Sequence, residues 1–236
     1  MSIISDNMQA VELAIQTAAE AAKRPRSAVQ LLAVSKTFPF DAVLDAMQTG
    51  QRAFGENYLQ EGVDKIAAVA AAAPSEQLEW HFIGPIQSNK TRPIAENFAW
   101  VHAVDRLKIA QRLSEQRPAG MPPLNICLQV NISGEVSKSG VSPDQLAELA
   151  HQVAALPNLR LRGLMAIPEP ESDAAKQHLP FARVRMLFEE LQAYGLPLDT
   201  LSMGMSGDLA AAVAEGATIV RIGTAIFGNR TYKEHA

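Results

Sequence analysis

Lys36 is the first residue whose type and position could do chemistry. It follows the apolar run 31–34 and precedes Pro39, so it is expected at the end of a buried strand, on the face of Leu32 and Val34. A lysine in an apolar setting loses its proton more readily, and the free amine can attack a carbonyl carbon to form a Schiff base. The alternative is a strand-end lysine that extends its ammonium into solvent.

A second candidate is the glycine-bearing turn around Ser206. Gly204 and Gly207 lie close to Ser206, and a helical pattern follows at 208–216. A turn that leads into a helix presents unbonded N–H groups and the positive end of the helix dipole, which together attract an anion such as a phosphate. The alternative is a plain strand-to-helix loop in which Ser206 or Asp208 caps the helix.

The β-type run 218–227 carries a third set of residues. Arg221 and Gly223 share one face of the expected strand, and Thr224 adds a hydroxyl donor. An arginine in an apolar strand needs a partner, and the glycine beside it permits close approach by a ligand. A structural ion pair between Arg221 and Glu56 would explain the charge, although it would not explain the glycine.

Together these residues suggest pyridoxal 5′-phosphate (PLP). Its aldehyde would bond Lys36, and its phosphate would lie at Ser206, Gly223 and Thr224. Arg221 would face the pyridine nitrogen, which stays largely unprotonated because a guanidinium keeps its proton. Such a ring is a weak electron sink, which narrows the carbanion chemistry that it can support.

The elements that must position these residues alternate between strand and helix. A helical pattern at 6–23 comes first, and helical patterns then separate the β-type runs. Eight runs in a chain of this length predict a single-domain (β/α)₈ barrel over residues 1–236, with an extra N-terminal helix. An open doubly wound sheet is the alternative. The runs are 31–36, 52–57, 79–84, 100–105, 125–133, 159–167, 200–206 and 218–227. In such barrels the strands' carboxyl ends carry the active site, and phosphates often bind after strands seven and eight.

Composition narrows the classes of function. The chain has 236 residues and a formal net charge of −4, which argues against a nucleic-acid or anionic-membrane partner. Its one cysteine, Cys127, excludes an intrachain disulfide and lies in an apolar run, so a buried, inert thiol is expected. The five histidines show no metal-ligand spacing, and no metal site is predicted. The N-terminus lacks a signal-peptide pattern and no apolar stretch is long enough to span a membrane, so a cytoplasmic protein is expected.

Longer motifs carry a resemblance to a known family. LLAVSKTFP, FGENYLQEGVDK, EWHFIGPIQSNK, QVNISGEVSKSG, RGLMAIP, LSMGMSGD and VRIGTAIFG are spread along the whole chain. In these motifs the chain resembles the pyridoxal phosphate homeostasis proteins. The resemblance implies the fold of the alanine racemase N-terminal domain and PLP on the lysine of VSK. It also implies PLP contacts at Lys36, Asn57, Ser206, Arg221, Gly223 and Thr224, with His81 and Met165 as pocket-wall candidates. Gly207 departs from the family, where an acidic residue is common.

The function expected from the resemblance is to hold PLP and to maintain vitamin B6 balance, without enzymatic turnover. A two-base racemase needs an acid or base on each face of the cofactor, and alanine racemase takes a tyrosine from a second domain. Only nine residues follow Phe227, and none of the three tyrosines, Tyr58, Tyr194 and Tyr232, has a scaffold that places it over the expected site, although Tyr232 could fold back. A single-domain racemase of low activity, a Schiff-base aldolase acting on a phosphorylated sugar, and an interaction protein remain as alternatives.

The expected partners are PLP itself and, transiently, PLP-dependent or B6-salvage enzymes. Lys138 lies in a Gly/Ser-rich loop at the expected mouth of the barrel, where it could pass PLP to another protein. The alternative is a solvated loop lysine.

Overall fold

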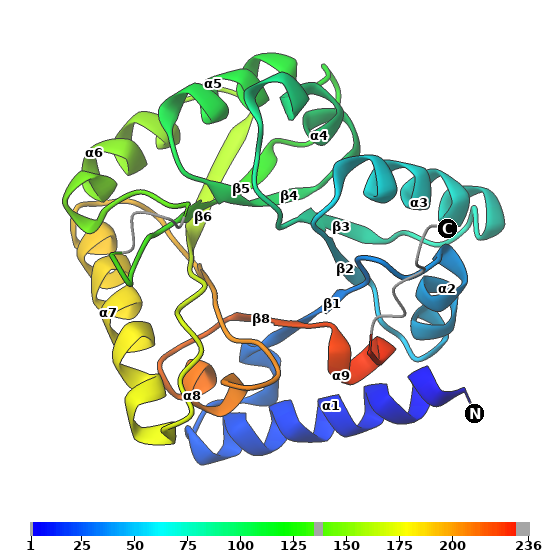
Figure 1. Cartoon of the computed structure of the whole chain (residues 1–236). Helices are drawn as coiled ribbons and strands as arrows, with labels where there is room; N and C mark the ends of the chain where they lie inside the picture. The colour runs from blue at the N-terminus through cyan, green and yellow to red at the C-terminus, as the bar shows by residue number, and fades with distance from the viewer. Residues whose placement is uncertain (1, 135–138, 230–236) are drawn as a thin grey trace, which may run out of the picture.

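The computed structural model describes residues 2–134 and 139–229. Eight parallel strands follow one another around a closed barrel, and β8 pairs with β1 to complete it (Figure 1). The predicted (β/α)₈ barrel is therefore confirmed, and the open doubly wound alternative is wrong. The strands are β1 (Gln30–Val34), β2 (Ala53–Glu56), β3 (Glu79–Phe82), β4 (Trp100–Val104), β5 (Leu124–Gln129), β6 (Leu159–Met165), β7 (Thr200–Ser202) and β8 (Ile219–Ile222).

Helices surround the barrel, because each strand must be covered on its outer face as well as filled on its inner one. The α-helices are α1 (Ile3–Ala21), α2 (Phe40–Gln48), α3 (Leu59–Ala72), α4 (Thr91–Asn97), α5 (Leu107–Gln116), α6 (Pro143–Ala154), α7 (Ala174–Ala193), α8 (Leu209–Ala214) and α9 (Thr224–Phe227). Two short 3₁₀ helices, η1 (Arg26–Ala28) and η2 (Ser88–Lys90), precede β1 and α4. Within the described ranges, no helix is long and apolar enough to cross a membrane.

The predicted N-terminal helix is present as α1. It runs along the edge of the barrel beside α2, α8 and α9 (Figure 1). The side-chain amide of Asn7 donates to the carbonyl of Ile226 in α9, at 2.9 Å. α1 therefore supports the segment that follows β8, next to the point where the barrel closes.

Every strand ends earlier than the run predicted for it, and at β8 and β1 the difference moves residues of the expected site out of the strand. β8 stops at Ile222, and Thr224–Phe227 form α9 instead of continuing the strand, because the N–H groups of Ile226 and Phe227 both turn back to the carbonyl of Gly223. The run IGTAIF is apolar enough for a strand, yet both Ile226 and Phe227 are buried from a helical turn. β1 likewise stops at Val34, so Lys36 lies in the turn after the strand.

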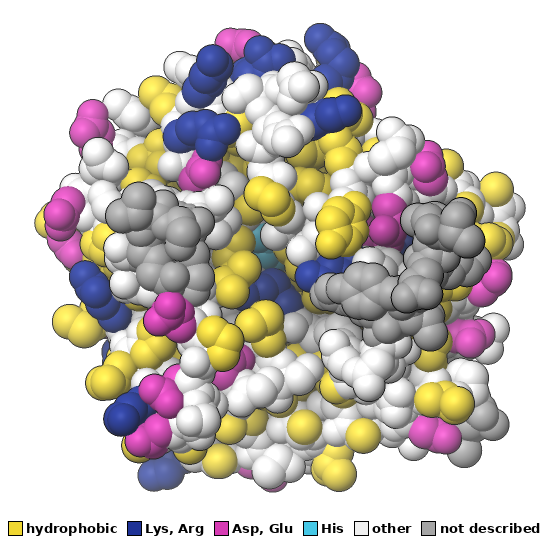
Figure 2. Space-filling view, in the orientation of Figure 1, with side chains coloured by type: hydrophobic (Ala, Val, Ile, Leu, Met, Phe, Trp, Pro, Cys, Tyr) yellow, Lys and Arg dark blue, Asp and Glu magenta, His cyan; other side chains and the backbone are white. Residues whose placement is uncertain are grey.

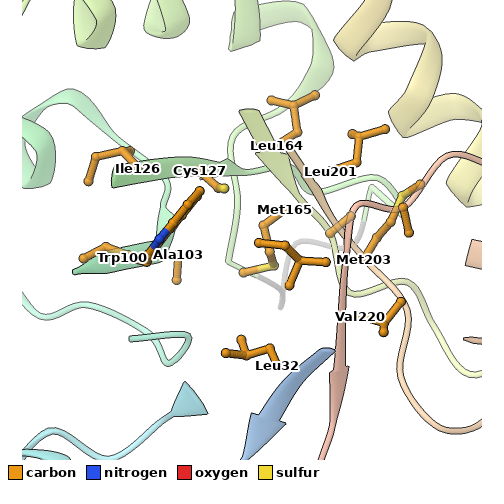
Figure 3. Packing of buried hydrophobic residues seen from close by; sticks show 14 of the residues in the cluster. Leu32, Trp100, Ala103, Ile126, Cys127, Leu164, Met165, Leu201, Met203 and Val220 are labelled. Carbon is orange, nitrogen blue, oxygen red and sulfur yellow. The ribbon is translucent and has the colours of Figure 1, made fainter. Parts of the chain in front are cut away.

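The core is one continuous hydrophobic cluster that includes the barrel interior and the layer between strands and helices. Figure 3 shows part of it, with Met165 lying between Leu32 and Leu164 in this view. Cys127 belongs to this cluster and is fully buried. Burial raises the pKa of its thiol to about 12, so the expectation of a buried, unreactive cysteine is confirmed.

Candidate functional site

A cavity of about 300 Å³ opens at the carboxyl ends of the strands. Figure 2 shows this face, with basic side chains in the hollow at its centre. The cavity is lined by Val34, Lys36, Asn57, Ile83, Ile167, Met205, Ser206, Gly207, Arg221, Gly223 and Thr224. Six of the eight residues singled out from the sequence are thus brought together from the ends of four strands.

Lys36 reaches the cavity from a tight turn. The N–H of Ser35 still bonds the carbonyl of Gly55 in β2, and the N–H of Phe38 then bonds the carbonyl of Ser35 to close the turn. Thr37 adopts a left-handed conformation with φ of 69°, which is uncommon for a branched residue and requires support from its surroundings. Its N–H donates to a carboxylate oxygen of Glu61, at 2.5 Å. The turn therefore has a defined shape, and Lys36 at its centre is half-buried.

A buried cluster lies behind this turn. The ammonium of Lys65 is 2.6 Å from Glu56, 3.0 Å from Glu61 and 2.8 Å from the carbonyl of Ser35. The hydroxyl of Ser35 donates to the same oxygen of Glu56, at 2.6 Å. Burial raises the pKa of the Glu56 carboxyl, against the opposing charge of Lys65. The sequence reasoning missed Lys65, for which the four-residue spacing from Glu61 was the one available signal.

Arg221 has a different environment. One terminal nitrogen, Nη1, is 2.6 Å from the carbonyl and 2.8 Å from the hydroxyl of Ser202, and Nη2 is 2.9 Å from the carbonyl of Ala166. Glu56 bonds Lys65 instead, so the ion pair between Arg221 and Glu56 is wrong. Among the residues that the structure describes, no carboxylate lies within ion-pair distance of Arg221. Burial lowers the pKa of Arg221 to about 10, which leaves it protonated at neutral pH.

The turn between β7 and α8 presents main-chain donors. Asp208 does not cap α8 with its side chain; its carboxylate accepts the N–H of Met205 at 2.6 Å and closes the turn on itself. In the described parts of the chain, the N–H groups of Ser206 and Gly207 donate to no other backbone group. They are thus available to an anion in the cavity, and Thr224 contributes its hydroxyl from the first position of α9.

His81 and Met165 do not line this cavity, in contrast to the expectation from the resemblance. Both are fully buried below it. Strand alternation predicts which face a side chain takes, but it does not predict the depth at which the side chain lies in the barrel. The wall is formed by Ile83 and Ile167, each two residues further along the chain. These isoleucines, like Met205, were missed as contacts, although their positions just beyond strand ends were visible in the sequence.

A second hollow of about 300 Å³ adjoins the first and shares Asn57, Ile83 and Ile167 with it. The side-chain oxygen of Asn57 is buried without a hydrogen-bond partner among the described residues. Gly84 is required here, since a Cβ on it would lie 2.2 Å from the carbonyl of Asn57. Lys138, considered above as a transfer residue, lies outside the described residues.

The histidines come together in a way that their spacing does not indicate. His81 and His102 lie on β3 and β4, and their ring nitrogens are 2.9 Å apart inside the barrel. Over the described ranges, however, no three His, Cys, Asp or Glu side chains form a group able to hold a metal ion.

Comparison with known proteins agrees with this architecture. Residues 7–231 match the family model for the alanine racemase N-terminal domain. An alanine racemase from Clostridium difficile has the same fold at 13% identity, with a TM-score of 0.72, over 97% of this chain and 59% of that one. PipY of Synechococcus elongatus, solved with PLP bound, is 38% identical with a TM-score of 0.81, over 95% of this chain and all of that one.

Relatives with closer sequences carry one name. The pyridoxal phosphate homeostasis protein of Pseudomonas aeruginosa is 64% identical over 98% of both chains. That of Vibrio cholerae is 57% identical over the full length of both, and that of Escherichia coli K12 is 53% identical over 99% of this chain and all of its own. The chain therefore belongs to the pyridoxal phosphate homeostasis proteins, within the alanine racemase N-terminal domain family.

Proposed function

We propose that the protein binds PLP in the cavity at the barrel mouth, holds it as a Schiff base on Lys36, and serves vitamin B6 homeostasis as a carrier. One observation supports this most strongly: a single cavity contains a lysine amine, a turn with available N–H donors, and a buried arginine that has no carboxylate within ion-pair distance among the described residues. The names of the relatives and the PLP-bound structure of PipY point the same way.

The residues present suit such a ligand. The N–H groups of Ser206 and Gly207 and the hydroxyl of Thr224 would hold the phosphate. A Cβ on Gly223 would lie 3.1 Å from the carbonyl of Val34, so a side chain there would crowd the strand pair at the base of the cavity. When bound, PLP supplies an aldehyde that condenses with an amine and a ring that withdraws electrons from the product.

Lys36 and Arg221 have separate tasks in this proposal. Lys36 would hold PLP through its amine, with the aldehyde of PLP supplying the carbonyl carbon for a Schiff base and its oxygen released as water. Arg221 keeps its proton and offers N–H donors to the ring nitrogen. The ring then stays a weak electron sink, which favours holding and releasing PLP over turnover of amino acids. Transient contacts with PLP-dependent or B6-salvage enzymes in the cytoplasm would provide the exchange.

The first test is to trap the bond chemically. Borohydride reduction of the PLP-loaded protein is expected to fix one pyridoxyl group to Lys36, and Lys36→Ala should abolish this adduct. Lys138→Ala is the matched control and should leave the adduct in place. Peptide mapping that finds the group mainly on Lys138 or Lys90 would show that Lys36 is not the attachment point.

The phosphate contact is tested by Thr224→Val, which keeps the shape of the side chain and removes its donor. The affinity for PLP should fall by about 1–3 kcal/mol, because the bond is charge-assisted. The affinity for unphosphorylated pyridoxal should change much less. Equal losses for the two ligands would place the phosphate elsewhere.

A slow racemase is the second candidate, favoured by the fold shared with alanine racemase. The carrier proposal expects negligible formation of D-amino acids or keto acids when the PLP-loaded protein is incubated with each common L-amino acid. Turnover on the order of 1 s⁻¹ or faster, the lower edge of typical enzymes, would replace the carrier with the racemase.

A further inference from the structure

A continuous chain of hydrogen bonds crosses the barrel interior from Arg221 to the opposite end of the strands. The Nη1 nitrogen of Arg221 is 2.8 Å from the hydroxyl of Ser202, which is 2.8 Å from Nδ1 of His102. Nε2 of His102 is 2.9 Å from Nδ1 of His81, and Nε2 of His81 is 2.9 Å from a carboxylate oxygen of Glu79. Both histidines are fully buried, whereas the Glu79 side chain is 41% exposed.

The direction of every bond follows from the two ends of the chain. A hydrogen bond from His81 lowers the pKa of Glu79 to about 2, so Glu79 is a carboxylate and can only accept. Burial lowers the pKa of both His81 and His102, so both rings are neutral at pH 7 and each carries a single N–H.

The tautomers are then determined in turn. His81 must donate from Nε2 to Glu79, which leaves its Nδ1 as an acceptor for the Nε2–H of His102. Nδ1 of His102 in turn accepts the hydroxyl proton of Ser202, whose oxygen accepts an N–H of Arg221. Every donor therefore points toward Glu79, with a positive charge at one end of the chain and a negative charge at the other.

The surroundings hold the middle of this chain in place. The indole ring of Trp100 stacks on the imidazole of His81, with centroids 5.3 Å apart and an interplanar angle of 4°. The guanidinium of Arg162 in turn lies 4.7 Å from the centroid of the Trp100 ring. The imidazole of His81 therefore has little freedom to rotate away from its two partners.

We propose that Glu79, His81, His102 and Ser202 are positioning residues that fix the guanidinium of Arg221. The carbonyl and hydroxyl of Ser202 occupy Nη1, and Ala166 takes one hydrogen of Nη2. Of the five N–H donors of arginine, the Nε–H and the second Nη2 hydrogen are left for a ligand in the cavity. These hydrogen bonds therefore determine which N–H groups of Arg221 face the ligand. The inference rests on the proposed function, in which that ligand is PLP.

The first test needs no PLP. Long-range ¹H–¹⁵N correlation spectra of the ¹⁵N-histidine-labelled apoprotein at pH 7 are expected to show His81 and His102 as neutral rings protonated at Nε2. A ring protonated at Nδ1, or at both nitrogens, breaks the chain of donors and would overturn the proposal.

The second test separates positioning from general support of the fold. The wild type should bind PLP about tenfold more tightly than 1-deaza-PLP, which has carbon in place of the ring nitrogen, because the analogue loses a charge-assisted hydrogen bond. In His102→Phe this preference should fall to within about twofold, while His151→Phe, on the outer helix α6, should keep it. A loss that is equal for the two ligands would mean that His102 is merely structural.

Glu79→Gln provides a second variant at the exposed end of the chain, where substitution does not disturb the packed interior. It should lower the preference for PLP in part, because the amide still accepts from His81 but lacks the charge. An unchanged preference in Glu79→Gln, together with a folded His102→Phe that also keeps it, would overturn the proposal. If the wild type binds neither ligand, the proposed function is wrong. The spectra of the apoprotein still show whether the hydrogen bonds from Arg221 to Glu79 are formed as described.

Discussion

Two buried cations lie at the same end of the barrel, and their surroundings differ. Lys65 contacts two carboxylates, Glu56 and Glu61, within 3.0 Å. Arg221 contacts only carbonyl and hydroxyl oxygens within the described part of the chain. The ammonium of Lys65 is therefore paired with carboxylates of the protein, whereas the guanidinium of Arg221 has no such pair among the described residues and can bind a ligand. The type of the residue alone, a buried basic side chain, does not distinguish a structural cation from a functional one.

The compensated cation still serves the site indirectly. Lys65 and its carboxylates bond the backbone on both sides of Lys36, through the carbonyl of Ser35 and the N–H of Thr37. The cluster therefore stabilises the left-handed turn that holds Lys36 at the cavity.

Removing Lys65 should have the largest effect on stability. Lys65→Met leaves the carboxylate of Glu56 buried and unpaired, so the free energy of unfolding should fall by about 3–5 kcal/mol in urea titrations. The exposed Lys108→Met is the control and should have little effect. Adding Glu56→Gln to Lys65→Met should restore part of the loss; if the double variant is no more stable than the single one, the pair does not act as a unit.

Removing the other cation should cost less. Arg221→Met leaves no carboxylate behind, only the carbonyls of Ser202 and Ala166 beside a cavity that water can enter. We expect a loss of about 1–2 kcal/mol in the same titrations, together with weaker PLP binding. A destabilisation equal to that of Lys65→Met would show that Arg221 is as structural as Lys65.

The smallest expected effect is on the pH dependence of stability. It should distinguish Arg221, which is linked to buried histidines, from Lys65, which is linked to carboxylates. Burial lowers the pKa of His81 and His102 in the folded state, so the unfolded chain binds protons more readily as the pH falls below about 6.5. Stability is therefore fully present above that pH and is lost below it, by up to about 1.4 kcal/mol per pH unit for each histidine. Urea titrations from pH 7 to 5.5 should show a shallower slope for His102→Phe.

Lys65 bonds Ser35, Glu56 and Glu61, and no histidine is among its hydrogen-bond partners in the described residues, so Lys65→Met should keep the wild-type slope over the same range. A slope that flattens in Lys65→Met and persists in His102→Phe would reverse this assignment.

The fold was predictable because its signals are local and repeated. Eight apolar runs separated by helical patterns specify a closed parallel barrel, and the strand-end rule identified Lys36, Ser206 and Arg221 as neighbours. Within the described residues, a helix was predicted as a strand at 224–227, where four residues are too few to show a period.

The partners of buried side chains were not predictable in the same way. His81 and His102 meet because β3 and β4 pair in a particular register and both side chains reach the same depth in the barrel. Neither the register of the strands nor the depth of a side chain in the barrel can be predicted from the spacing of the residues. The same reason explains why the alternative for Arg221, an ion pair with Glu56, is wrong: Glu56 bonds Lys65 of α3 in the structure.

The seam between β1 and β8 has a consequence for synthesis of the protein. Leu32 in β1 pairs with Arg221 in β8, so Lys36 and Arg221 meet only after the last strand has joined the first. Closing such a long loop is among the slower steps of folding. On the ribosome, a growing chain would therefore present Lys36 long before it could assemble the cavity around it, and binding of the cofactor would report that the barrel is complete.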